Sequence, residues 1–101
     1  MFDMFGKMDE MKRQMEEVKK RMDDITVEGE AGSGTVKAIV TANKKLKNLS
    51  ISEELIRDGD KEQIEDLVTV AINRALDQAE AIHDTEMKKM AGGLLPPGLG
   101  F

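Results

Sequence analysis

Cysteine, tryptophan and tyrosine are absent from the 101-residue sequence, and only three phenylalanines are present. Without cysteine the chain has no disulfide, thiolate metal site or cysteine nucleophile, and it fits a reducing compartment. Phe2, Phe5 and Phe101 lie at the two ends of the sequence. We therefore do not expect a platform of aromatic side chains that stacks single-stranded bases.

Long apolar runs are also absent. The longest, residues 67–72, is far shorter than the roughly 20 residues that cross a bilayer. The first ten residues include Asp3, Lys7, Asp9 and Glu10, so they lack the basic and apolar regions of a secretory signal. We expect a soluble cytoplasmic protein with no membrane partner.

Signals of enzyme chemistry are few. His83 is the only histidine, and the chain offers no cysteine or second histidine with which it could form a metal site. The glycine-rich segment 32–34 lies between two predicted strands, so it lacks the helix N-terminus of a phosphate-binding loop. We predict no catalytic residue, no metal, no cofactor and no small-molecule substrate.

Residues 3–24 have the pattern of one long amphipathic helix. Apolar side chains recur at alternating intervals of four and three, which is a coiled-coil heptad pattern. The predicted dimer or helix seam consists of Met4, Met8, Met11, Met15, Val18 and Met22. Charges beside the seam, such as Lys12, Lys19 and Arg21, are basic, whereas residues 52–101 carry a net charge of −6. Packing against the second helix, within or between protomers, is therefore favoured over parallel self-pairing.

Three short segments have the alternation of β-strands. Residues 25–30 and 35–41 predict two antiparallel strands joined by a turn at 31–34. A second turn at 42–45 and alternating residues at 48–52 predict a third strand. Together they form a three-stranded antiparallel meander.

A second long helix is predicted over residues 61–90. Asp60 and Gln63 have the spacing of a capping box, and apolar residues recur at helical period up to residue 82. Gly92 and Gly93 are expected to stop this helix.

These elements define an α+β fold: long helix, three-stranded antiparallel meander, long helix. Residues 1–91 form a single α-β-β-β-α domain, and residues 92–101 form a Gly/Pro-rich tail. Both helices are longer than the sheet can cover, so we expect a homodimer. The tail is either disordered or docks its apolar residues on a groove of the dimer; these are Leu94, Leu95, Leu99 and Phe101.

Several segments together resemble the YbaB/EbfC nucleoid-associated proteins of bacteria. They are residues 1–7 (MFDMFGK), 28–34 (EGEAGSG), 60–68 (DKEQIEDLV), 73–75 (NRA), 86–90 (EMKKM) and 95–98 (LPPG). The resemblance covers nearly the whole chain. It implies a tweezer-like homodimer in the cytoplasm and nucleoid that binds duplex DNA with low sequence specificity and alters its conformation or organisation. It implies no enzymatic activity.

The charge of the chain limits where DNA could bind. The formal net charge is −5, whereas binding a duplex normally requires several basic residues on one surface. A DNA site must therefore be a local cluster. The first candidates are Lys19, Lys20, Arg21, Lys88 and Lys89, and the second choice is Lys37, Lys44, Lys45 and Lys47.

An alternative function stays open on the sequence alone. Methionine is flexible and polarizable, so the Met-rich seam could hold protein clients, as in a prefoldin-like chaperone or interaction module. Salt distinguishes the two functions, because phosphate binding weakens steeply with salt whereas apolar binding persists or strengthens.

Overall fold

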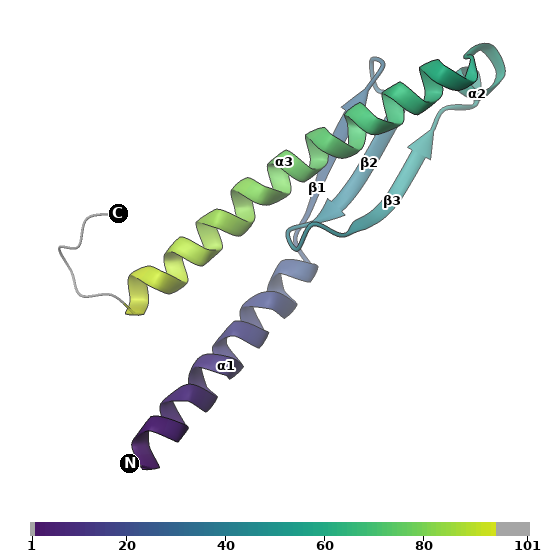
Figure 1. The fold of residues 1–101 in the computed structure, drawn as a ribbon. Helices are drawn as coiled ribbons and strands as arrows, with labels where there is room; N and C mark the ends of the chain where they lie inside the picture. Colours follow the sequence, from purple (N-terminus) through teal and green to yellow (C-terminus); the bar gives the residue numbers. More distant parts are fainter. Residues whose placement is uncertain (1, 95–101) are drawn as a thin grey trace.

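The chain is described from a computed structural model that covers residues 2–94, with side chains described for residues 8–90. Its elements are α1 (Phe2–Asp23), β1 (Thr26–Ala31), β2 (Val36–Thr41), β3 (Leu46–Ile51), α2 (Glu53–Asp58) and α3 (Lys61–Leu94). Figure 1 shows α3 running along the sheet and α1 extending away from one end of it. The predicted α+β order is confirmed. Within the described residues, no helix is long and apolar enough to cross a membrane.

The turn between β1 and β2 depends on backbone conformations that favour glycine. Residues 32–34 all adopt positive φ, which glycine reaches at little cost. Thr35 Oγ1 closes the turn by donating to the carbonyl oxygen of Gly32 at 2.8 Å. The two strands then pair in antiparallel register.

The pairing of β2 with β3 contains an irregularity. Ile39 pairs with Asn48, but the next residue, Val40, pairs with Leu46. Lys47 is therefore an extra residue of β3, as in a β-bulge. This lysine lies in an exposed outer strand.

Helix α3 covers one face of β1 and β2. The buried core between them consists of Ala31, Val36, Ala38, Val40, Leu55, Ala71, Ala75 and Ala79. Three alanines of α3 spaced four residues apart let the helix approach the sheet closely. The approach is closest at Gly29, where a Cβ atom would lie 2.3 Å from the carbonyl oxygen of Ala71.

The two edges of the sheet differ. Along β1, Arg74 Nη1 donates to the carbonyl oxygen of Glu30, and Gln78 Nε2 donates to that of Glu28, both at 2.8 Å. These side chains occupy acceptors that an added strand would need. Strand β3 lies at the other edge, and its Leu46 is 49% exposed.

Helix α1 and the second half of α3 extend beyond the sheet in the same direction (Figure 1). Near the sheet they pack through a small cluster of Val18, Met22 and Ala42, with Ile25, Ile82, Met87 and Met90 against it. The two helices of one chain therefore contact each other close to the sheet. Farther along α1, Met8, Met11 and Met15 are exposed. The side chain of Met4 lies outside the described residues.

Helix α2 was not predicted from the sequence. At six residues it is too short to show a helical period. Its N-terminus is capped by Ser52, whose Oγ accepts from the backbone N–H of Leu55 at 3.1 Å, and Leu55 is buried. Capping and one buried leucine therefore maintain this turn of helix.

Helix α3 begins as predicted but ends later. The carboxylate of Asp60 accepts from the backbone N–H of Gln63 at 2.7 Å. The helix then continues through Gly92 and Gly93 to Leu94, because glycine in a helix costs about 1 kcal/mol but does not break it. The remaining predicted tail, residues 95–101, lies outside the described residues.

Candidate nucleic-acid interface

Helix α1 ends in a group of basic side chains beside the sheet. Lys20 and Arg21 occupy its last turn, directly after Lys19, where the partial negative charge of a helix C-terminus favours cations. The helix stops as the backbone N–H of Asp24 donates to the carbonyl oxygen of Arg21 at 3.1 Å. All three basic residues are exposed at this junction.

An open hollow of about 650 Å³ joins this helix end to the turn between β2 and β3. We call it the basic hollow; it is lined by Glu16, Lys19, Lys20, Asp23, Asn43, Lys45 and His83. Asn43 Nδ2 donates to the carbonyl oxygen of Lys19 at 2.8 Å and to Asp23 Oδ1 at 2.7 Å. The structure thus brings together Lys19, Lys20 and Lys45, which the sequence placed in two separate clusters.

The other lysines of the sheet differ in their position. Lys44 is exposed in the same turn as Lys45, with a φ of 66°. Lys37 lies on the face of β2 away from α3, with its Nζ 3.8 Å from Glu28 Oε1. Neither Lys37 nor Lys47 lines the basic hollow.

Two further candidates converge on one carboxylate of α3. Arg21 Nη2 lies 2.9 Å from Glu86 Oε2, and Lys89 Nζ lies 3.7 Å from Glu86 Oε1. The hydrogen bond from Arg21, with smaller contributions from the charge of Lys89, holds the pKa of the Glu86 carboxyl below its ordinary value. Glu86 therefore competes with a phosphate for both cations. Lys88 is exposed and forms no ion pair within the described part of the chain.

Acidic side chains reduce the positive potential of the basic hollow. Its three lysines share the lining with the carboxylates of Glu16 and Asp23. One of these, Asp23, already accepts the amide of Asn43. The hollow therefore offers a few point contacts to phosphates within a weak local field.

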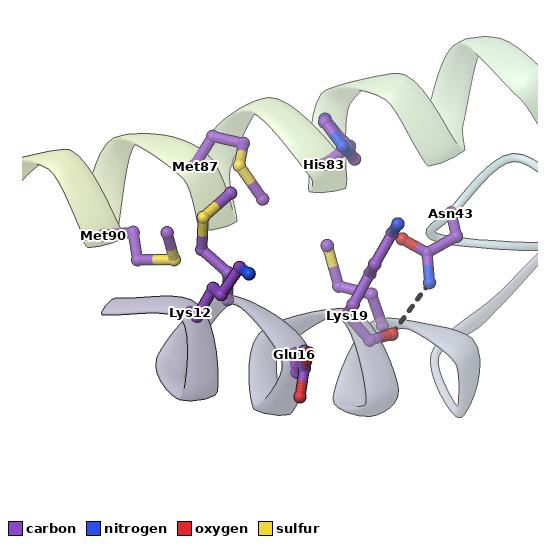
Figure 2. Close-up of a pocket in the computed structure, with 9 residues that line it drawn as sticks. Lys12, Glu16, Lys19, Asn43, His83, Met87 and Met90 are labelled. Atoms are coloured by element: carbon purple, nitrogen blue, oxygen red, sulfur yellow. Dashed lines mark hydrogen bonds between the residues drawn. The ribbon is translucent and has the colours of Figure 1, made fainter. Parts of the chain in front are cut away.

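A second depression, of about 290 Å³, lies between α1 and α3 beside the basic hollow. We call it the methionine groove; it is lined by Lys12, Met15, Glu16, Lys19, Met22, Asn43, His83, Met87 and Met90. Figure 2 shows Met87 and Met90 of α3 directed toward α1. Flexible thioether side chains of this kind can pack around an apolar chain segment.

Sequence reasoning did not find Asn43 or Glu86. Asparagine is common in turns for local reasons, so Asn43 gave no signal beyond the turn itself. Glu86 is one of eleven acidic residues in the segment 52–101. Only their contacts with a helix distant in the sequence distinguish them.

The fold and this surface define a small α+β protein with a projecting pair of helices and an exposed group of lysines. In the part of the chain that the structure describes, no three side chains are placed to hold a metal ion. The chain belongs to the YbaB/EbfC DNA-binding family, whose sequence model matches residues 1–94.

Individual relatives agree with this assignment. A nucleoid-associated protein of Chlorobaculum parvum is 40% identical over 95 residues, which cover 94% of this chain and 84% of that protein. One of Beijerinckia indica is 35% identical over 100 residues, covering 96% and 99%. Among solved structures, an uncharacterized protein from Helicobacter pylori has the same fold, with a TM-score of 0.77 and 22% identity over 87% of this chain and 92% of that one.

Proposed function

We propose that the protein is a nucleoid-associated protein that binds duplex DNA through the basic hollow. The observation that carries this proposal is the convergence of Lys19, Lys20 and Lys45 on one open surface in a chain of a DNA-binding family. Ammonium groups at such a surface release counterions from phosphates, which supplies the affinity. No catalytic step is part of this function.

Binding should discriminate little between sequences. Lysine meets a phosphate as a point charge and lacks the fork with which arginine recognises guanine. The arginine nearest to the basic hollow, Arg21, is engaged by Glu86. Contacts of this kind position a protein on the duplex without reading its bases.

We further propose that the protein acts as a homodimer formed at the β3 side of the sheet. Leu46, Leu49 and Ile51 share the face of β3 that continues the core, and Leu46 and Leu49 are 49% and 37% exposed. The opposite edge is occupied by Arg74 and Gln78. Uncovered apolar rows of this kind mark association sites.

A dimer would present the basic hollow twice. Two weak sites on one particle bind a duplex more tightly than either alone, because the second contact is intramolecular. Two separated contacts also constrain the path of the DNA between them, which would alter its conformation or organisation. Location in the cytoplasm, at the nucleoid, follows from this function.

Charge reversal in the basic hollow tests the DNA site. If three lysines of each protomer contact phosphate, the slope of log affinity against log salt is about −5.4, at about −0.9 per contact. With Lys19→Glu and Lys20→Glu we expect a slope of log affinity against log salt no steeper than about −1.8. We also expect the affinities for duplexes of unrelated sequence to fall by similar factors. The matched control is Arg57→Glu with Lys61→Glu, since both side chains are exposed at the far end of the molecule. Equal loss in the two variants would contradict the proposed site.

The methionine groove supports a second candidate function, the binding of protein clients. Its apolar walls and the exposed Met8, Met11 and Met15 suit binding of apolar protein segments. A client complex of this kind would persist or strengthen between 50 and 500 mM salt, whereas DNA binding would be lost. Absence of DNA binding by the parent protein at low salt would favour this chaperone-like function.

A further inference from the structure

The apolar seam of α1 is covered over only part of its length. Val18 and Met22 are buried against α3, at 9% and 1% exposure. Met15 lines the methionine groove but is 53% exposed, and Met11 and Met8 continue the same seam at 44% and 63%. An apolar surface thus extends along α1 from the methionine groove, in the direction in which α3 ends (Figure 1).

The segment that follows α3 is close enough to reach this surface. Met90 is the last residue of α3 that lines the methionine groove, and the helix ends at Leu94, about 6 Å farther along its axis at 1.5 Å per residue. A return from Leu94 to the level of Met87 covers about 10 Å. Seven residues in extended conformation span about 23 Å, so residues 95–101 can reach this level.

The sequence of this segment also fits the groove. Residues 95–101 read Leu-Pro-Pro-Gly-Leu-Gly-Phe, with three large apolar side chains and no charged side chain. Pro96 has no backbone N–H to donate, so this sequence does not favour continuation of a helix. Gly98 permits the backbone conformations needed to reverse direction.

We propose that residues 95–101 fold back onto their own chain and place Leu99 and Phe101 in the methionine groove against α1. The tether gives the segment an effective concentration on the order of 1 mM. A dissociation constant of about 1 mM therefore suffices for half occupancy.

Docking of the segment has a consequence for the basic hollow, and this part rests on the proposed function. Lys19 and Asn43 line both depressions. A filled methionine groove holds α1 at a fixed distance from α3 and so keeps Lys19 and Lys20 in place beside Lys45. The docked segment thus stabilises the arrangement of the DNA-binding surface, and we call this effect the brace.

Disulfide trapping tests the docking without DNA. Because the protein has no cysteine, the double variant Met15→Cys with Leu99→Cys contains one possible pair. The control is Glu17→Cys with Leu99→Cys, since Glu17 lies two residues along on the opposite face of α1. We expect an intrachain disulfide to form at least about tenfold faster in the Met15 variant than in the Glu17 control. Docking raises the local concentration of the thiol at position 99 near position 15 but not near position 17. Equal rates, or a disulfide only between chains, would overturn the proposal.

Replacing the apolar side chains of the segment tests whether docking stabilises the DNA-binding surface. In the full chain with Leu99→Ser and Phe101→Ser, we expect the methyl NMR signals of Met15, Met87 and Met90 to shift, and DNA affinity at low salt to fall several-fold with the salt slope unchanged. Unchanged methyl signals would refute docking, and shifted signals with unchanged DNA affinity would refute the brace. A parent protein that binds no DNA would refute the proposed function, while the trapping result would still decide the docking.

Discussion

The carboxylate of Glu86 should limit the affinity for DNA, and replacing it should increase binding. Glu86→Gln removes the charge that holds Arg21 at 2.9 Å and Lys89 at 3.7 Å. If one of these cations then contacts phosphate in each protomer, a dimer gains two contacts, and the slope of log affinity against log salt steepens by about 1.8. Over a fourfold change in salt, from 50 to 200 mM, the affinity of the variant would fall about 12-fold more than that of the parent.

Fluorescence anisotropy with an unrelated duplex at several salt concentrations measures this slope. The matched control is Glu80→Gln, which removes the same charge from an exposed position on α3 that forms no ion pair within the described residues. We expect the control to leave the slope unchanged. If both variants raised the affinity by the same factor without a change in slope, net charge would explain the effect, and the release of Arg21 and Lys89 would be refuted.

Three further predictions concern stability. Gly29→Ala should lower the free energy of unfolding by about 1–3 kcal/mol, because its Cβ would collide with the backbone at Ala71; unchanged denaturant unfolding would contradict this close packing. Val18→Asp should cost roughly 2 kcal/mol or more because Val18 is buried, whereas Glu17→Ala should stay within about 0.5 kcal/mol, and equal melting temperatures would refute the assignment of the seam. Since the folded pKa of Glu86 lies below its ordinary 4.5, its contribution is present above pH 4.5 and lost as pH falls through the folded value. The difference in melting temperature between parent and Glu86→Gln should therefore shrink below pH 4.5, and a constant difference would exclude an ionic cause.

The parts of the fold that repeat a pattern were predictable from the sequence. Alanines four residues apart in α3 and the alternation of Val36, Ala38 and Val40 each mark a face that must be buried. The charges beside the first seam favoured contact with the acidic second helix, and near the sheet Val18 and Met22 of α1 pack with residues of α3. Such patterns succeed because burial acts on many residues of one element at once.

The candidate site was predictable only in part, because its geometry depends on single contacts between distant residues. Lys19 and Lys45 were both candidates, but the bond from Asn43 to the carbonyl of Lys19 spans 24 positions. The ion pair of Arg21 with Glu86 spans 65. Neither contact leaves a periodic trace in the sequence. Composition therefore indicated which residues could bind phosphate, but not which of them lie together or are already neutralised.

The position of the acidic end makes the proposed DNA binding compatible with a net charge of −5 at physiological salt. Carboxylates gather in α2 and at the start of α3, at the end of the sheet away from α1 (Figure 1). From Glu65 to His83, which lines the basic hollow, is about 27 Å along α3 at 1.5 Å per residue. The Debye length is about 8 Å at 0.15 M salt but about 30 Å at 0.01 M. At 0.15 M salt the acidic end is therefore screened from a duplex bound at the basic hollow. At 0.01 M salt it repels that duplex.

This distance predicts a salt-dependent effect of neutralising the acidic end. Glu62→Gln, Glu65→Gln and Asp66→Asn together should leave DNA affinity unchanged at 150 mM salt and raise it several-fold at 10 mM, because only then does the repulsion reach the duplex. For the same reason the salt slope of the parent should flatten as the salt concentration falls toward 10 mM, and that of the variant should not. Anisotropy titrations of both proteins from 10 to 200 mM measure these slopes. An equal gain in affinity at both salt concentrations would mean that bound DNA lies against the acidic end, and the basic hollow would then be the wrong site.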